Sequence, residues 1–329
     1  MITDTRIKIL GYIRAHKQAR AHDLLKVFGI SQVAVHKHLK NLLNKGEIKK
    51  VGKPPLVFYV PADKKEEIVA DVPAEIKKII DKNYLYISPV GELLYGFEGF
   101  ATWVKSIKEQ KRLSKLAVEY ANTLNRFKKH FKTNNWIDAT NKLQNTFKEI
   151  FADKLFYADF YSLPKFGKTK LGQLVLYAKQ SQNRELINQL ATSIKPIIEK
   201  IIQEFSIDAV AFIPPTVPRT LQFMNELEIA LNLKLPSIEL VKAAAGEVVV
   251  AQKTLARLEE RIINARDTIF MKDNKNLYSN VLLIDDAAGS GSTFNETAKK
   301  LKTVMIGNNQ IVAFAIVGSF KGFDVIREV

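Results

Sequence analysis

Two adjacent carboxylates, Asp285 and Asp286, begin the segment of the sequence with the clearest chemical pattern. They follow an apolar run at 281–284 and precede a group of very small residues, after which a helix is expected. Backbone N–H groups in such a loop, and at the start of a helix, can surround a phosphate group. The residues predicted to form this anion site are Ala287, Ala288, Gly289, Ser290, Gly291, Ser292 and Thr293.

The carboxylates narrow the choice of ligand. Two negative side chains beside a phosphate loop would repel a bare anion, but they can accept hydrogen bonds from two ribose hydroxyls. The segment therefore predicts a site for a ribose 5-phosphate. A Walker loop fits less well because no Lys follows Gly291, and a dinucleotide fingerprint would need glycine where Phe294 stands.

The same segment resembles the phosphoribosyltransferase signature, in which two acidic residues after a strand precede a Thr/Ser-Gly-x-Thr loop. Residues 151–329 are also similar to the ComF family of phosphoribosyltransferase-like proteins, in the stretches 174–180, 212–230 and 252–270. In the last stretch the matching residues are Gln252, Leu255, Arg261, Asn264 and Phe270. The chain departs from that family by one extra residue before Arg261 and by Gly289 in place of a hydroxyl residue.

The resemblance implies that this region binds phosphoribosyl diphosphate (PRPP) and, in a transferase, that Asp285 and Asp286 are catalytic. Mg²⁺ would be carried by PRPP, since magnesium commonly binds substrate phosphates with only one or two protein carboxylates. An enzyme would then act by positioning the ribose and stabilising the leaving diphosphate. The candidates for contacting the pyrophosphate are Arg219, Lys253, Arg257 and Arg261. An exposed basic helix face would explain the last three equally well.

Alternating strand and helix patterns surround this segment. Apolar runs at 209–213, 236–240, 281–285 and 311–317 predict strands, and helices fit 217–231 and 294–305. This alternation predicts a C-terminal α/β domain at 151–329 built on a parallel sheet, like that of type I phosphoribosyltransferases. Ligands of such sheets bind at the carboxyl ends of the strands, which is where the two Asp residues stand.

Residues 1–62 follow a different pattern, three short helices and then a hairpin. Ser31 is expected to cap the third helix, and the hairpin strands at 47–51 and 56–60 are joined by 52–55. Asp4 is expected to cap the first helix, whose Ile7, Leu10 and Ile13 follow helical spacing. This order resembles the winged-helix regulators of the MarR and ArsR type.

The third predicted helix has a polar face suited to the major groove of DNA. Residues 1–62 contain twelve Lys or Arg and only three Asp or Glu, so the segment would attract phosphates. We therefore expect double-stranded DNA as a partner, although winged helices also mediate protein contacts. The expected DNA-binding residues are Gln32, His36, Lys37 and Lys40 on the helix and Lys53 in the hairpin.

Residues 63–150, rich in helix formers, predict a helical connector that forms a homodimer surface. An aromatic group within it could line a pocket, but a place in a core or an interface is the preferred interpretation. This group consists of Tyr84, Tyr86, Tyr95, Phe97, Phe100 and Trp103.

Composition excludes several classes of function. The chain of 329 residues has no Cys, which removes disulfide frameworks, thiolate nucleophiles and zinc ribbons, and suits the cytoplasm. No apolar run approaches the roughly 18 to 20 residues that span a bilayer, so we expect no membrane partner. The net charge of +16 favours polyanions.

Together these features predict a multidomain transcription regulator that senses PRPP or a related nucleotide, with an architecture similar to purine repressors. Two alternatives remain open at this point. The chain could be an active phosphoribosyltransferase acting on a nucleobase, localised by its N-terminal domain. It could also be a ComF-like protein of DNA uptake or processing with a DNA-tethering module.

Overall fold

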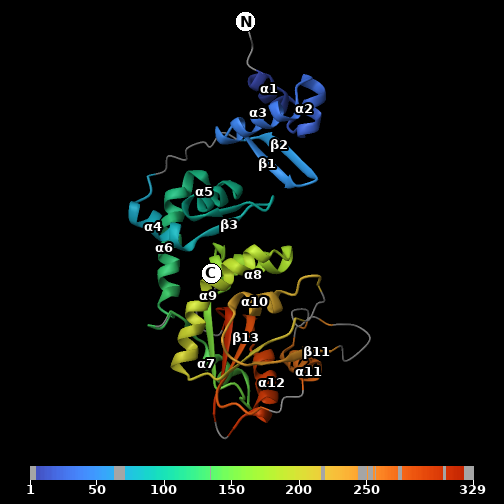
Figure 1. The fold of residues 1–329 in the computed structure, drawn as a ribbon. Coiled ribbons are helices and arrows are strands. Elements are labelled where there is room, and N and C mark those ends of the chain that lie inside the picture. The colour runs from blue at the N-terminus through green and yellow to red at the C-terminus, as the bar shows by residue number, and fades with distance from the viewer. Residues whose placement is uncertain are drawn as a thin grey trace. The chain divides into compact units, whose positions relative to one another are not determined.

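The computed structural model describes most of the chain and separates it into two compact units, Met1–Val69 and Ala70–Val329 (Figure 1). The boundary expected between a connector at 63–150 and a domain at 151–329 falls inside the second unit. The described residues are 5–62, 71–133, 135–215, 219–243, 250, 255, 257–272, 276–306 and 309–321. Asp4, the expected first helix cap, lies outside them.

The first unit contains three helices followed by an antiparallel hairpin, in the order that the sequence predicts. Its elements are α1 (Thr5–His16), α2 (Ala21–Phe28), α3 (Gln32–Asn44), β1 (Ile48–Lys53) and β2 (Leu56–Pro61). Helix α2 ends at Gly29, which is left-handed with φ 59°, and Ser31 accepts the Ala34 N–H at the start of α3. Lys53 pairs with Leu56, so the turn is shorter than expected.

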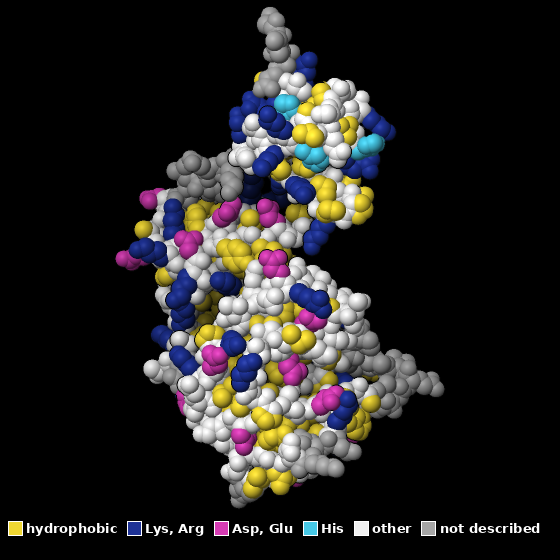
Figure 2. All heavy atoms as spheres, in the orientation of Figure 1, with side chains coloured by type: hydrophobic (Ala, Val, Ile, Leu, Met, Phe, Trp, Pro, Cys, Tyr) yellow, Lys and Arg dark blue, Asp and Glu magenta, His cyan; other side chains and the backbone are white. Residues whose placement is uncertain are grey.

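The core of this unit corrects one expectation. Ile9, Leu10 and Ile13 are buried on α1, whereas Ile7 is 57% exposed. The reason is that Ile9 and Ile13, four residues apart, form the inward stripe of the helix and turn Ile7 away from it. On α3 the buried residues are Val35, Leu39 and Leu42, as expected. Figure 2 shows many Lys, Arg and His side chains on the surface of this unit.

The second unit is built around a six-stranded sheet with the order β10-β9-β13-β14-β6-β5. Its strands are β5 (Ile137–Asp138), β6 (Lys154–Phe160), β9 (Ala209–Phe212), β10 (Ser237–Ile238), β13 (Val281–Ala288) and β14 (Ile311–Gly318). Neighbouring strands are parallel except β5, which pairs antiparallel with β6. The sheet is therefore mixed rather than wholly parallel, because a segment assigned to the connector adds an edge strand.

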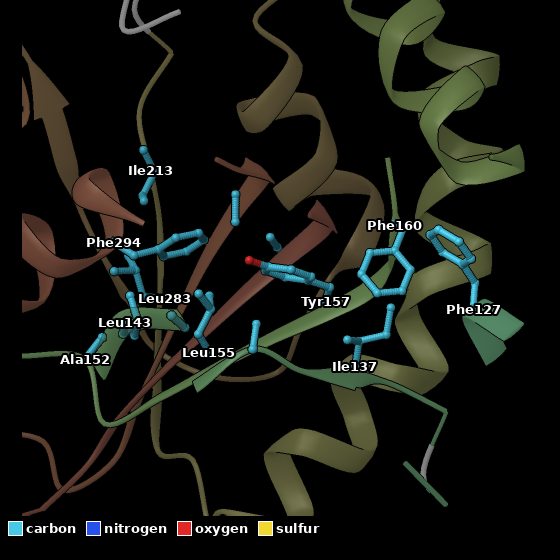
Figure 3. Packing of buried hydrophobic residues seen from close by; sticks show 14 of the residues in the cluster. Phe127, Ile137, Leu143, Ala152, Leu155, Tyr157, Phe160, Ile213, Leu283 and Phe294 are labelled. Atoms are coloured by element: carbon cyan, nitrogen blue, oxygen red, sulfur yellow. The ribbon is translucent and has the colours of Figure 1, made fainter. Parts of the chain in front are cut away.

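Helices cover both faces of this sheet and form two cores with it. On one face lie α8 (Lys170–Ser181), α9 (Arg184–Glu204) and α10 (Phe223–Leu231), and on the other α7 (Thr140–Thr146), α11 (Leu258–Thr268) and α12 (Ser292–Leu301). Successive residues of a strand point to opposite faces, so Leu283 lies in one core and Ile284 in the other. Figure 3 shows Leu283, Tyr157 of β6 and Phe294 of α12 meeting in the first of these cores.

The residues before the sheet share its first core instead of forming a separate connector. Tyr84, Phe100 and Tyr120 are buried, with edge-to-face contacts to one another or to Phe166. Tyr86, Phe97 and Trp103 pack against the same core, so most of the aromatic group serves packing. The elements of this segment are α4 (Ala74–Asn83), β3 (Leu85–Ile87), β4 (Leu93–Tyr95), α5 (Gly96–Ser106), η1 (Gln110–Arg112) and α6 (Leu113–Lys128).

Short elements complete the second unit. The apolar run at 236–240 is divided at Glu239, after which β11 pairs antiparallel with β12. These elements are β7 (Ser162–Leu163), β8 (Gly167–Lys168), β11 (Leu240–Lys242), β12 (Ile269–Met271) and η3 (Lys302–Val304). Within the described residues, no helix is both long and apolar enough to cross a membrane.

Candidate functional site

The segment with the two Asp residues lies at the carboxyl end of β13, near the middle of the sheet. β13 is longer than expected, since Ala287 and Ala288 remain in the strand and pair with Val317 and Gly318 of β14. These two alanines were expected in the phosphate loop. They stay in the sheet because β14 offers them partners as far as Gly318, so the loop is reduced to Gly289–Gly291.

The backbone of Gly291 fixes the geometry of this loop. Gly291 is the residue before α12 and has φ 86°, a conformation that residues with a side chain rarely adopt. A Cβ placed on it would lie 2.7 Å from Leu143 Cδ2, so the loop is closely packed from behind. The hydroxyls of Ser290 and Ser292 lie 3.1 Å apart, and α12 follows directly. The loop thus leads directly into the positive end of α12, where the Ser292 N–H donates to Ser290 Oγ at 3.4 Å.

The two carboxyl groups have opposite electrostatic surroundings. Burial and the negative charge of Asp286 raise the pKa of Asp285 well above its usual value. Burial alone would also raise the pKa of Asp286, but the ammonium of Lys179 forms an ion pair with it and lowers that pKa. Asp285 Oδ1 accepts the Asp286 N–H at 2.7 Å. One carboxyl therefore favours the neutral form and its neighbour the ionised form.

Cationic side chains from four segments lie around these two acids and the loop. Lys179 comes from the end of α8, and Arg219 Nη1 donates to its carbonyl oxygen. Lys242 of β11 lies near Asp285, and burial lowers its pKa although the charge of Asp285 opposes this effect. Arg261 of α11 reaches the loop itself, because its Nη1 would lie 3.8 Å from a Cβ on Gly289.

Of the four residues expected to contact the pyrophosphate, the structure places two near the acids or the loop. Arg219 lies beside the acids through Lys179, and Arg261 lies beside the loop. Arg257 precedes α11, where its backbone N–H donates to Glu260 at 3.3 Å. Its side chain is exposed and forms no hydrogen bond or ion pair with the described residues of the loop. Lys253 lies outside the described residues.

Sequence reasoning missed Lys179 and Lys242 as site residues. Lys179 had a signal, because it ends a stretch that is similar to the early helix of the ComF family. Lys242 had none, since it follows an ordinary apolar run and reaches the acids only through the pairing of β11 with β12.

No group of three or more acidic or histidine side chains suited to a metal occurs in the described part of the chain. Two neighbouring carboxyl groups are nevertheless compatible with Mg²⁺ that keeps most of its ligands from water and phosphate oxygens.

Comparisons with known proteins give distant similarities. No family model matches the chain, and no curated protein matches it. It is similar to the structure of a hypoxanthine phosphoribosyltransferase from Staphylococcus aureus, with 13% identity, 41% of this chain and 74% of that chain covered, and a TM-score of 0.25. It is also similar to the structure of the UMP synthase of Leishmania donovani, with 15% identity and a TM-score of 0.24. This match covers 63% of this chain and 40% of that chain.

The second unit has a mixed α/β sheet, and its assignment to a phosphoribosyltransferase-like fold stays a prediction from the sequence. The similarity to the ComF family and the winged-helix assignment stay predictions from the sequence. The function must therefore be inferred from the residues of this chain alone.

Proposed function

We propose that this chain is a DNA-binding transcription regulator whose second unit senses PRPP or a related nucleotide. The observation that carries the proposal is the arrangement at the carboxyl end of β13. There Asp285, Asp286 and the amides of Gly289–Thr293 are adjacent, and the loop begins a ten-residue helix. Hydroxyl-binding groups and phosphate-binding groups thus follow each other within one short segment.

The charges around this segment favour a phosphorylated ligand over a neutral sugar. Two carboxyl groups, one of them with a raised pKa, face Lys179, Lys242 and the nearby arginines. Since the cations outnumber the ionised acids, an anion reaching the loop is attracted. A diphosphate carrying Mg²⁺ would place its second charged group near Arg219 or Arg261.

The first unit supplies the surface for DNA. Gln32, His36, Lys37 and Lys40 are exposed on α3, opposite the buried Val35, Leu39 and Leu42. A helix of this kind fits the major groove, while Lys53, exposed at the hairpin end, can neutralise a phosphate.

Regulation requires that the ligand bind more tightly to one state of the protein than to another. We propose a homodimer, because two recognition helices bind half-sites one helical turn apart only when their separation is correct. A ligand that changes the separation of the two first units would then change the affinity for DNA.

Calorimetric titration with Mg-PRPP tests the ligand site directly. The Thr293→Ala variant removes a hydroxyl from the first turn of α12 and is expected to bind PRPP at least about tenfold more weakly. Thr303→Ala is the matched control, since its hydroxyl lies exposed beyond the other end of the helix. Equal affinity of the wild type and Thr293→Ala would contradict the phosphate assignment.

Two further assays separate sensing from catalysis. Fluorescence anisotropy with duplex DNA at fixed salt should give a changed affinity when Mg-PRPP is saturating. Unchanged affinity, with PRPP binding demonstrated, would contradict sensing. Release of pyrophosphate from PRPP with a panel of nucleobases, abolished by Asp285→Asn with Asp286→Asn, would instead support the enzymatic alternative.

A further inference from the structure

Lys142 lies beside the candidate site, although it comes from a segment in which the sequence pattern predicts no chemistry. It belongs to α7, and its Nζ lies 2.6 Å from Ser319 Oγ and 3.5 Å from Ser319 O. Ser319 follows β14, and its N–H donates to Ala288 O at 3.0 Å. A chain of two hydrogen bonds thus joins Lys142 to the last residue of β13, where the loop begins.

The segment that carries Lys142 also packs against the far side of the loop. A Cβ on Gly291 would meet both Leu143, at 2.7 Å, and Phe147, at 3.6 Å. Asn295 of α12 donates to Glu149 O at 2.9 Å and accepts the Phe151 N–H at 2.8 Å. Residues 142–151 therefore run along the loop and the start of α12, and Lys142 is connected through Ser319 to Ala288, the residue after which the loop begins.

The described surroundings of Lys142 offer hydroxyl and carbonyl oxygens and no carboxylate paired with its ammonium. Its side chain is half-buried, and among the described residues no acidic group forms an ion pair with its Nζ. Burial, together with the positive charge of nearby Lys321, lowers the pKa of Lys142 to about 8. A half-buried ammonium whose hydrogen-bond partners are neutral costs free energy, which an anion at the same place would recover.

We infer that Lys142, positioned by Ser319, binds the phosphate group of a ligand held by the amides of Gly289–Thr293. The inference rests on the proposed ligand class and adds a residue that neither the two acids nor the loop motif indicates. Amides of the loop supply hydrogen-bond donors but no formal charge, and Arg261 beside Gly289 carries a single positive charge, so a phosphate dianion there lacks a second counter-charge. The ammonium of Lys142 supplies one, and Ser319 Oγ keeps it at the end of β14.

The first test measures the Lys142 ammonium itself. Lysine side-chain NMR of the full chain, with Lys142→Arg to assign the signal, gives the pKa of Lys142 with and without inorganic phosphate. Saturating phosphate should raise this pKa by about one unit, because a dianion favours the charged form. An unchanged pKa at saturation would show that Lys142 only supports Ser319 and would overturn the inference.

The second test uses ribose 5-phosphate and calorimetry at pH 8 in two buffers of different ionisation enthalpy. Since the pKa of Lys142 is about 8, binding to the wild type should take up about half a proton. Lys142→Arg should keep the affinity but lose the proton uptake, because an arginine stays charged. Lys142→Met should bind at least about tenfold more weakly.

The outcomes separate the inference from the proposed function. Lys148→Met is the matched control, since this exposed lysine lies on the same segment, and its affinity should equal that of the wild type. Ribose 5-phosphate binding that is unchanged in Lys142→Met would refute the role of Lys142 and leave the ligand class intact. If ribose 5-phosphate does not bind but inorganic phosphate raises the pKa of Lys142, the ligand class is wrong and the anion site stands. Where Lys142→Met does not fold, proton uptake that persists in Lys142→Arg refutes the inference.

Discussion

Replacing Asp159 by Asn should remove a pH-dependent loss of stability from the second unit. Asp159 lies near the carboxyl end of β6, half-buried, and its Oδ1 accepts the Phe160 N–H at 2.7 Å. Burial raises the pKa of Asp159 to about 7, although hydrogen bonds from Phe160 and Thr169 and the charge of Lys128 act in the opposite direction.

The sign follows from the proton balance between the folded and unfolded chain. The pKa of Asp159 is higher in the folded chain than its usual value of 3.8, so the folded state binds more protons between these two values. The stabilising contribution is therefore complete below about pH 4 and is lost as the pH rises through about 7. At about 1.4 kcal/mol per pKa unit the loss is at most about 4 kcal/mol, an upper bound because part of the carboxyl group reaches solvent.

Urea unfolding between pH 5 and pH 8.5 measures this effect. Both tryptophans of the chain, Trp103 and Trp136, lie in the second unit, so their fluorescence reports its unfolding. At pH 8 Asp159→Asn should be more stable than the wild type, and the difference between the two should shrink as the pH falls toward 5. Asp71→Asn, at an exposed position, is the control and should keep the wild-type profile. Parallel profiles of the wild type and Asp159→Asn across this range would refute the reasoning.

Three further substitutions have definite expected outcomes. Gly318→Ala should lower the free energy of unfolding by about 3 kcal/mol or more in urea titrations, because the new Cβ would lie 1.9 Å from the ring of Tyr157. Gly291→Ala should cost about 1 to 2 kcal/mol in the same assay through its positive φ, and should weaken ribose 5-phosphate binding in calorimetry. Lys37→Ala should weaken binding to all DNA sequences and reduce the slope of log affinity against log salt by about 0.9, with ribose 5-phosphate affinity unchanged; a slope equal to that of the wild type would contradict a phosphate contact.

The first unit is the part of the fold that the sequence predicts best, because its signals are local. Gly29 ends one helix and Ser31 begins the next through contacts within a few residues, and the structure has both. Ile7 follows the helical spacing of Leu10 and Ile13 but lies outside the core. Two overlapping stripes of apolar residues exist on α1, and only packing against α3 and β2 decides which one is buried.

In the second unit, local sequence signals predict the strand end and the helix start, but not the contacts that depend on strands far apart in the sequence. The acidic pair and Gly291 could be placed at a strand end and a helix start from sequence, since small residues and carboxylates mark that junction. The extension of β13 to Ala288 depends on β14, more than twenty residues further along the chain. Lys142 could not have been found, because Ser319 becomes its neighbour only through the sheet.

The unequal state of the two acids agrees with the ligand that the loop implies. Two ionised carboxylates offer only acceptors, whereas a neutral carboxyl beside an ionised one offers a donor as well. Lys179 maintains this inequality, because its ammonium keeps Asp286 charged while the charge of Asp286 raises the pKa of Asp285. Each hydroxyl of a vicinal diol both donates and accepts, so the mixed pair can satisfy more of a ribose than two carboxylates can. A ligand that bonds to Asp286 would compete with Lys179 for this carboxylate. Since Lys179 lies near the end of α8 and its carbonyl oxygen accepts a hydrogen bond from Arg219, such a ligand would also affect the contacts of that helix end.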